Sequence, residues 1–195
     1  MKHASRHVAT LGAAVLLAVA GLSLVSVQRA RTADNPSAQE RLQALEDKAA
    51  IREVILAYGR DLDARDWEAF SNLFAEEGEW IGGMGKGHGR AMIKKMMEDT
   101  IGSSPGGKIA ATGGQSNFHV FTNISIDVHG DTATGVTKWM FVVNADNKPQ
   151  PLYLGHYNDD FVRENGAWKF LRRTTYGDIP AAEPNMTVWQ PKADQ

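Results

Sequence analysis

The hydrophobic pattern of this chain changes its period once, and that change limits the folds open to it. From Glu40 to Leu62, apolar residues recur at spacings of three, four and seven, which is typical of an amphipathic helix. From residue 117 onwards the spacing becomes two, which is typical of strands that bury one face. Helices followed by consecutive strands predict an α+β fold, in which the helices cover one face of a sheet.

Three helices are expected, and residues 79–81 can begin a strand between the second and the third of them. The first covers the stretch that starts at Glu40. Asp66 has the position of an N-cap for a second helix, which is expected to end at Gly78. A third helix is expected over residues 90–99, after a glycine-rich loop at residues 82–89. The apolar stripe of the second helix would consist of Phe70, Leu73 and Phe74.

The second half of the chain predicts an antiparallel meander. Turns are expected at residues 129–131 and 144–149, and Asn165-Gly166 is the strongest hairpin signal in the sequence. In the first long strand, simple alternation places His119 on the face opposite to a set of apolar residues, and it leaves open which face lines a cavity. That set consists of Phe118, Val120, Ile124, Ile126 and Val128.

The first 33 residues differ from the rest. Lys2 and Arg6 precede a run without charges at residues 8–27, and Arg29 and Arg31 follow it. A basic region before an apolar run predicts an export signal, and hence a periplasmic or secreted protein. The run is also long enough to span a bilayer, so the alternative is a retained membrane tether through residues 8–27.

Behind this leader we expect one domain. Residues 34–39 are expected to form a short polar linker, residues 40–179 the folded domain, and residues 180–195 a polar tail without a period. One domain fits the length of 195 residues, which allows one well-buried core but hardly two.

Charge and cysteine content disfavour several classes of function. Without residues 1–33 the chain has 17 basic and 23 acidic residues, a net charge of −6. Such an acidic domain without a basic run is a poor binder of nucleic acid. The absence of cysteine excludes disulfides, thiol catalysis and thiolate metal sites. His3 and His7 are four residues apart but lie in the leader, and the other histidines show no HxxxH or HxH spacing, so we predict no metal site.

Three residues could carry chemistry. His119 in a strand would act as a general base near neutral pH if a carboxylate orients it. Asp63 could be that carboxylate, and the hydroxyl of Tyr58, five positions earlier, could donate to a developing oxyanion. Each also has a simpler interpretation, because Asp63 could cap a helix end, His119 could be structural and Tyr58 could be core. Their spacing alone does not show that they meet.

Several stretches resemble the SnoaL-like domain of the nuclear transport factor 2-like superfamily. Together these stretches cover roughly residues 40–177. Their order and spacing are more specific to the superfamily than any single stretch. The stretches are Ala49-Ala50-Ile51-Arg52, Leu62–Trp67, Gly78-Glu79-Trp80, Phe118–Asn123, Gly155-His156-Tyr157 and Gly166–Phe170.

The resemblance implies a fold and a function. It implies a cone-shaped, curved antiparallel sheet packed against three N-terminal helices, with a pocket for a small apolar molecule, and a homo-dimer or homo-trimer. Scytalone dehydratase, hexachlorocyclohexane dehydrochlorinase and bile-acid 7α-dehydratase are enzymes of that superfamily that the chain resembles. They are lyases without a cofactor, and their aspartate and histidine correspond to Asp63 and His119. Tyr58 resembles a tyrosine of the bile-acid enzyme, and Trp80 an aromatic pocket residue.

Two departures keep a second function open. A further histidine of scytalone dehydratase would fall near residues 142–143, and a functional arginine of the bile-acid enzyme near Asp178, and this chain has neither. His156 either faces the pocket and contacts the substrate or lies on the surface. The chain is therefore expected to be a dehydratase-like lyase or an isomerase, or else a protein that binds a small molecule in the same pocket without transforming it.

Overall fold

A computed structural model describes residues 36–102 and 117–191 of the chain. The expected export signal or membrane tether at residues 1–33 and the expected loop at residues 103–114 lie outside the described residues. Among the helices of the described ranges, none is both long and apolar enough to cross a membrane.

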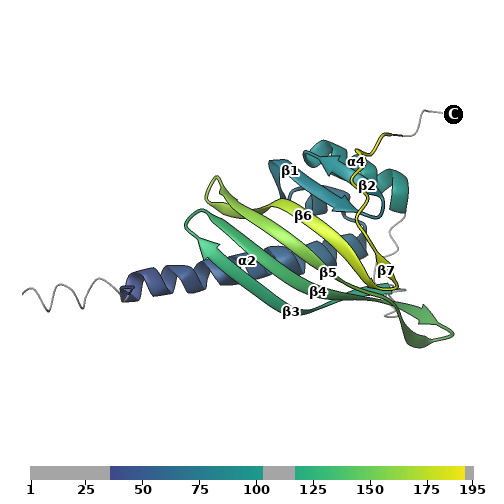
Figure 1. The fold of residues 1–195 in the computed structure, drawn as a ribbon, viewed down its shortest axis with the longest axis horizontal. Coiled ribbons are helices and arrows are strands. Elements are labelled where there is room, and N and C mark those ends of the chain that lie inside the picture. Colours follow the sequence, from purple (N-terminus) through teal and green to yellow (C-terminus); the bar gives the residue numbers. More distant parts are fainter. Residues whose placement is uncertain (1–35, 103–116, 192–195) are drawn as a thin grey trace, which may run out of the picture. The chain divides into compact units, whose positions relative to one another are not determined.

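The described part of the chain contains three helices and seven strands, and the expected α+β class is confirmed. The sheet has the strand order β2-β1-β6-β5-β4-β3, with β7 on β6, and Figure 1 shows these strands side by side. Every pair is antiparallel except β1 and β6, which run parallel, so the sheet is mixed rather than a pure meander. The elements are α2 (Ala38–Ala64), α3 (Trp67–Ser71), β1 (Phe74–Gly82), β2 (Gly85–His88), α4 (Arg90–Ile101), β3 (Asn117–His129), β4 (Thr132–Ala145), β5 (Lys148–Glu164), β6 (Ala167–Ile179) and β7 (Ala181–Ala182).

A capping box starts α2 at Ala38, inside the range expected to be a linker. The Ser37 hydroxyl accepts the backbone N–H of Glu40 at 3.2 Å, and the Glu40 carboxylate accepts the backbone N–H of Ser37 at 2.7 Å. This reciprocal pair satisfies two N–H groups that the first turn of a helix leaves without partners.

The apolar face of α2 beyond Ala44 forms the core with the sheet. One buried cluster joins residues of α2 to aromatic residues of β5 and β6, and we call the sheet face that carries these aromatic residues the inner face. Asp47 adds a polar link, because its carboxylate accepts hydrogen bonds from Arg163 at 2.6 Å and from the Trp168 ring at 3.1 Å. The α2 members of the cluster are Ile51, Ile55, Tyr58 and Leu62.

The second helix is shorter than its apolar stripe predicts. It ends at Ser71, and Phe74 begins β1 instead of closing the helix. Phe74 pairs with Phe170 of β6 and is fully buried, so sheet pairing outweighs the helical spacing. Gly78 lies within β1 at a register shift, where a Cβ atom would approach the Phe170 carbonyl oxygen to 2.9 Å. The prediction that Gly78 ends a helix is therefore wrong.

The glycine-rich segment at residues 82–89 is a hairpin rather than a loop. Gly85–His88 forms β2, which pairs with β1 across a turn at Gly83 and Met84. The glycines here permit close packing, because a Cβ atom on Gly87 would lie 3.0 Å from the Met96 side chain of α4.

A β-bulge in β3 overturns the simple alternation expected for residues 117–128. Asn123 has a φ of 49°, and the pairing of β3 with β4 shifts between Thr122 and Ser125. An extra residue reverses which side chains face inward. Phe118 and Val120 are therefore exposed, while His119 and Phe121 lie on the inner face together with the later even-numbered residues.

The tail after Pro180 lies against the sheet as far as Trp189. After β7, the backbone of Asn185 bonds to Gly82 at 3.0 Å, and Lys86 bonds to both Thr187 at 2.8 Å and Trp189 at 2.9 Å. The Trp189 side chain packs against the core cluster. The tail therefore continues the sheet beyond β2 and holds the hairpin of β1 and β2 in place.

Gly155 is the position where an added methyl group should cost most in the sheet. Its Cβ atom would lie 2.1 Å from the Tyr176 carbonyl oxygen and 2.4 Å from the Trp139 ring. We expect Gly155→Ala to lower the free energy of unfolding by about 1–3 kcal/mol, because backbone and ring must both move. Urea unfolding followed by circular dichroism measures this. Gly83→Ala is the control, since a methyl group there meets no atom within 4 Å; equal losses would contradict the prediction.

Candidate active site

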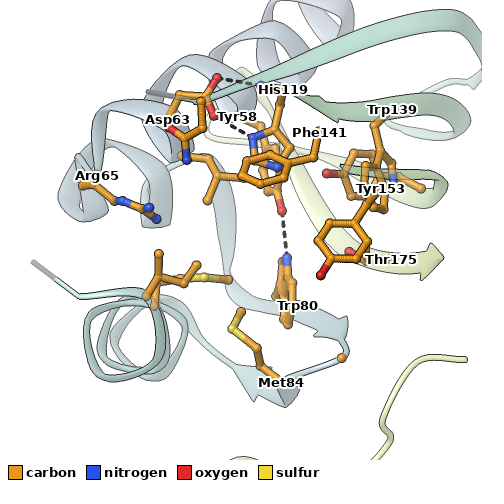
Figure 2. A pocket seen from close by; sticks show the side chains of 16 residues that line it. Tyr58, Asp63, Arg65, Trp80, Met84, His119, Trp139, Phe141, Tyr153 and Thr175 are labelled. Carbon is orange, nitrogen blue, oxygen red and sulfur yellow. Dashed lines mark hydrogen bonds and ion pairs between the residues drawn. The ribbon is translucent and has the colours of Figure 1, made fainter. Parts of the chain in front are cut away.

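A cavity of about 590 Å³ lies between the end of α2, α4 and the inner face of the sheet. Figure 2 shows its lining side chains, which are mostly apolar or aromatic. Strands β3 and β4 contribute Asn117, His119, Trp139 and Phe141, and α4 contributes Met97 and Ile101. The turn before β2 contributes Gly83 and Met84, and β5 and β6 contribute Tyr153, Tyr157 and Thr175. Tyr58, Leu62, Asp63 and Arg65 come from α2 and the residue after it, and Trp80 from β1.

Asp63 and His119 are in direct contact at one end of this cavity. The Asp63 Oδ1 atom lies 2.6 Å from His119 Nδ1, and Asp63 Oδ2 accepts the backbone N–H of His119 at 2.9 Å (Figure 2). Both carboxylate oxygens are therefore committed to His119. A carboxylate can only accept, so in the neutral ring Nδ1 carries the proton and Nε2 is the acceptor.

The remaining ring nitrogen of His119 is available to a ligand. Within the described part of the chain, Nε2 has no hydrogen-bond partner, and the side chain is 16% exposed. The ring packs against Phe141 with a centroid distance of 4.8 Å. An oriented imidazole with a free acceptor, held in apolar surroundings, can remove a proton from a bound molecule.

Tyr58 and Trp80 lie deeper in the cavity. The Trp80 ring N–H donates to the Tyr58 hydroxyl at 2.9 Å (Figure 2), and both side chains are buried. Burial raises the pKa of Tyr58, although the nearby Arg173 guanidinium lowers it. The hydroxyl is therefore neutral at physiological pH, and it acts as a donor rather than as a base.

The buried ion pair of Arg173 and Asp159 was not predicted from the sequence. Arg173 donates to both carboxylate oxygens of Asp159, at 2.8 and 2.7 Å, and both side chains are 0% exposed. The Arg173 guanidinium carbon lies 4.1 Å from the ring centres of Tyr58, Tyr157 and Phe170. A signal did exist, since Asp159 is two residues from each of the apolar positions 157 and 161, at strand period.

His156 is not among the residues that line the cavity. It alternates with the buried Tyr157 along β5 and so points to the opposite face of the sheet. There its Nδ1 atom lies 2.8 Å from Asp178, and its ring stacks on Tyr176 at 4.8 Å. The position of His156 on the opposite face of the sheet therefore does not support the expected contact with a substrate in this cavity.

No candidate metal centre is found in residues 36–102 and 117–191. In those ranges, no three His, Asp or Glu side chains are grouped so that they could hold a metal ion. The cavity itself offers one histidine and one carboxylate, and these bind each other.

Comparisons with known proteins agree on the fold. The model of the SnoaL-like domain family matches residues 43–174. An uncharacterized protein of Mycobacterium tuberculosis is 27% identical over 135 residues, which are 66% of this chain and 84% of that protein. The chain is also similar to a crystal structure of an NTF2-like protein with a cystatin-like fold from Novosphingobium aromaticivorans. That structure is 28% identical with a TM-score of 0.62, over 74% of this chain and 90% of the other.

A hexachlorocyclohexane dehydrochlorinase from Novosphingobium barchaimii has a similar fold. Its structure has a TM-score of 0.57 and 19% identity, over 71% of this chain and 90% of the other. At that identity the likeness concerns the fold alone.

Proposed function

This chain belongs to the SnoaL-like domain family, and from that premise we propose that it is a lyase or isomerase that needs no cofactor and acts on a small, largely apolar molecule. The observation that carries the proposal is the His119 ring, which Asp63 holds through Nδ1 while Nε2 stays free in an apolar cavity. The fold is shared with a dehydrochlorinase, a protein named for an elimination reaction.

In the proposed reaction His119 removes a proton from carbon. Nε2 takes the proton next to an activating or leaving group, and the electrons of the C–H bond form the new double bond. The leaving group departs with its own bonding pair. Asp63 stabilises the imidazolium through the bond to Nδ1. A departing hydroxide then receives the proton from His119 as water, while an isomerase returns the proton to another carbon.

Tyr58 is proposed to hold the oxygen of the substrate. Its hydroxyl accepts from Trp80 and is within hydrogen-bond reach of Tyr157, and in this proposal its own proton is donated to the ligand instead. Since burial raises its pKa, the hydroxyl keeps that proton and can stabilise an oxygen on which negative charge develops. His156, which lies outside the cavity, has no role in this proposal.

A non-catalytic binding protein is the second candidate function. It is favoured by the composition of the cavity wall, where aromatic and aliphatic side chains outnumber the polar ones. In this case Asp63 and His119 would orient a bound molecule through one hydrogen bond and transform nothing.

Co-purification separates the two candidates. The full-length chain is expressed as wild type, His119→Ala and His156→Ala, and each protein is extracted with organic solvent for mass spectrometry. We expect an intact ligand from His119→Ala, and its elimination or isomerisation product from wild type and His156→Ala. His156 is a matched control because it is a second histidine paired with an aspartate, outside the cavity. One unaltered ligand in all three proteins would refute catalysis and support the binding protein.

A further inference from the structure

Arg65 has an unusual backbone conformation for its residue type. It follows the last residue of α2 and has a φ of 58°. Helices often end with one residue in this left-handed region, and glycine is usual there because a Cβ atom is unfavourable. Here the position instead carries a long cationic side chain, and Figure 2 shows its guanidinium directed into the cavity.

The guanidinium of Arg65 forms no ion pair with a carboxylate in the described part of the chain. It makes no side-chain hydrogen bond or ion pair there, and its guanidinium carbon lies 5.7 Å from the centre of the Trp67 ring. Arg163 and Arg172, by contrast, each contact two carboxylates. Burial lowers the pKa of Arg65, against the opposing effect of the Asp63 charge. Arg65 is therefore a partly desolvated cation on the wall of an apolar cavity.

The charge of Asp63 acts on Arg65, but the two side chains form no hydrogen bond or ion pair. Each oxygen of Asp63 instead contacts His119, one the backbone N–H and one the ring. Asn117 supplies a second polar group at the same end, because it lies two residues before His119 on the same face of β3 and also lines the cavity. A planar guanidinium beside an amide presents several N–H donors, which suits an oxygen anion.

We propose that the molecule bound in this cavity carries one anionic group, a carboxylate or its equivalent, which Arg65 binds at the end of the cavity that holds His119. The remainder of the molecule is apolar and lies against the aromatic wall. This inference deepens the proposed function and rests on it in one respect, namely that the bound molecule is a substrate. An acid bound in this way would have the carbons close to its carboxylate presented to Nε2.

Two fluorescent probes with the same ring system test the anion site. The probe 8-anilinonaphthalene-1-sulfonate carries one anionic group, and N-phenyl-1-naphthylamine lacks it. Dissociation constants of both are measured by fluorescence titration on wild type, Arg65→Gln and Arg60→Gln. We expect Arg65→Gln to weaken the sulfonate about tenfold relative to the neutral probe, which is the order of effect of losing a charge-assisted hydrogen bond. Arg60 lies on α2, is exposed and does not line the cavity, so Arg60→Gln should leave the ratio unchanged.

Two outcomes would overturn the inference. One is an unchanged ratio in Arg65→Gln, and the other is an equal fall in Arg60→Gln, which would reflect net charge alone. Arg65→Lys keeps the charge without the planar fork, and it should retain part of the preference. Binding of the probes does not depend on turnover, so the two proposals can fail separately. If Arg65 selects the anionic probe but co-purification shows one unaltered ligand in all variants, the proposed function is refuted and the anion site remains. A reaction without selectivity would refute the site alone.

Discussion

Replacing Asp63 by asparagine is expected to lower turnover by about 10²–10⁴-fold, the usual contribution of general acid–base catalysis. The reason lies in the two hydrogen bonds of Asp63. The backbone N–H of His119 needs an acceptor, so the amide oxygen must lie there, and the amide NH₂ group then faces Nδ1. Nδ1 becomes an acceptor, the ring proton moves to Nε2, and the base in the cavity is lost.

The tautomer can be measured without knowing the substrate. Ring ¹⁵N chemical shifts should show His119 protonated at Nδ1 in the neutral wild type and at Nε2 in Asp63→Asn. Asp61→Asn is the matched control, because Asp61 lies on the same helix and neither lines the cavity nor bonds to His119. An Asp63→Asn variant that keeps the proton on Nδ1 and loses no turnover would contradict the proposed role of the pair.

The second large effect is expected from the buried pair of Arg173 and Asp159. Replacing Arg173 by methionine leaves a carboxylate at 0% exposure without its cation. We expect the free energy of unfolding to fall by about 3–5 kcal/mol, because an uncompensated buried charge is among the costliest defects in a core. Urea unfolding at pH 7, followed by circular dichroism, measures the loss.

The double variant Arg173→Met with Asp159→Leu is the control. Both charges are then removed, and such replacements are often neutral or even stabilising, so most of the loss should be recovered. A double variant as unstable as the single one would contradict this account and indicate that packing, rather than charge, is what matters here.

The pH dependence of the single variant follows from the raised pKa of Asp159. Burial raises that pKa, and Arg173 opposes the shift, so the variant lacks the opposing effect. A carboxyl whose pKa is higher in the folded state binds protons preferentially there. The stability that this carboxyl contributes is therefore fully present below its pKa in the unfolded state, about 3.9. That contribution is lost as the pH rises through its higher pKa in the folded state. The penalty of Arg173→Met should accordingly shrink as the pH approaches 4.

The sequence predicts the class of the fold and the identity of the paired residues better than it predicts the faces of the strands. Periodicity indicates α4 and the long strands, and Asn165-Gly166 turns where expected, with positive φ at both residues. Asp63 and His119 are 56 residues apart in sequence, and only the resemblance to the superfamily predicts that they are in contact. Their catalytic role stays a prediction.

Two bulges explain why the alternation misplaces residues. The bulge at Asn123 turns His119 inward, and asparagine is among the few residue types that accept a positive φ readily. In β6, the register with β5 shifts so that Phe170 and Arg173 both face the core, although they are three residues apart. Each bulge depends on the register that the strand adopts with its neighbour, which the alternation within one strand does not specify.

The tail supports the wall of the cavity with residues that do not themselves line it. Residues 185–189 hold β2, and the turn that leads into β2 supplies Gly83 and Met84 to the cavity wall. Two relatives with identical lining residues and different tails would therefore hold that wall at different distances from His119. A classification by lining residues alone would therefore place chains with cavities of different width in one group. Exchanging tails between relatives would be expected to change the cavity width without changing a lining residue.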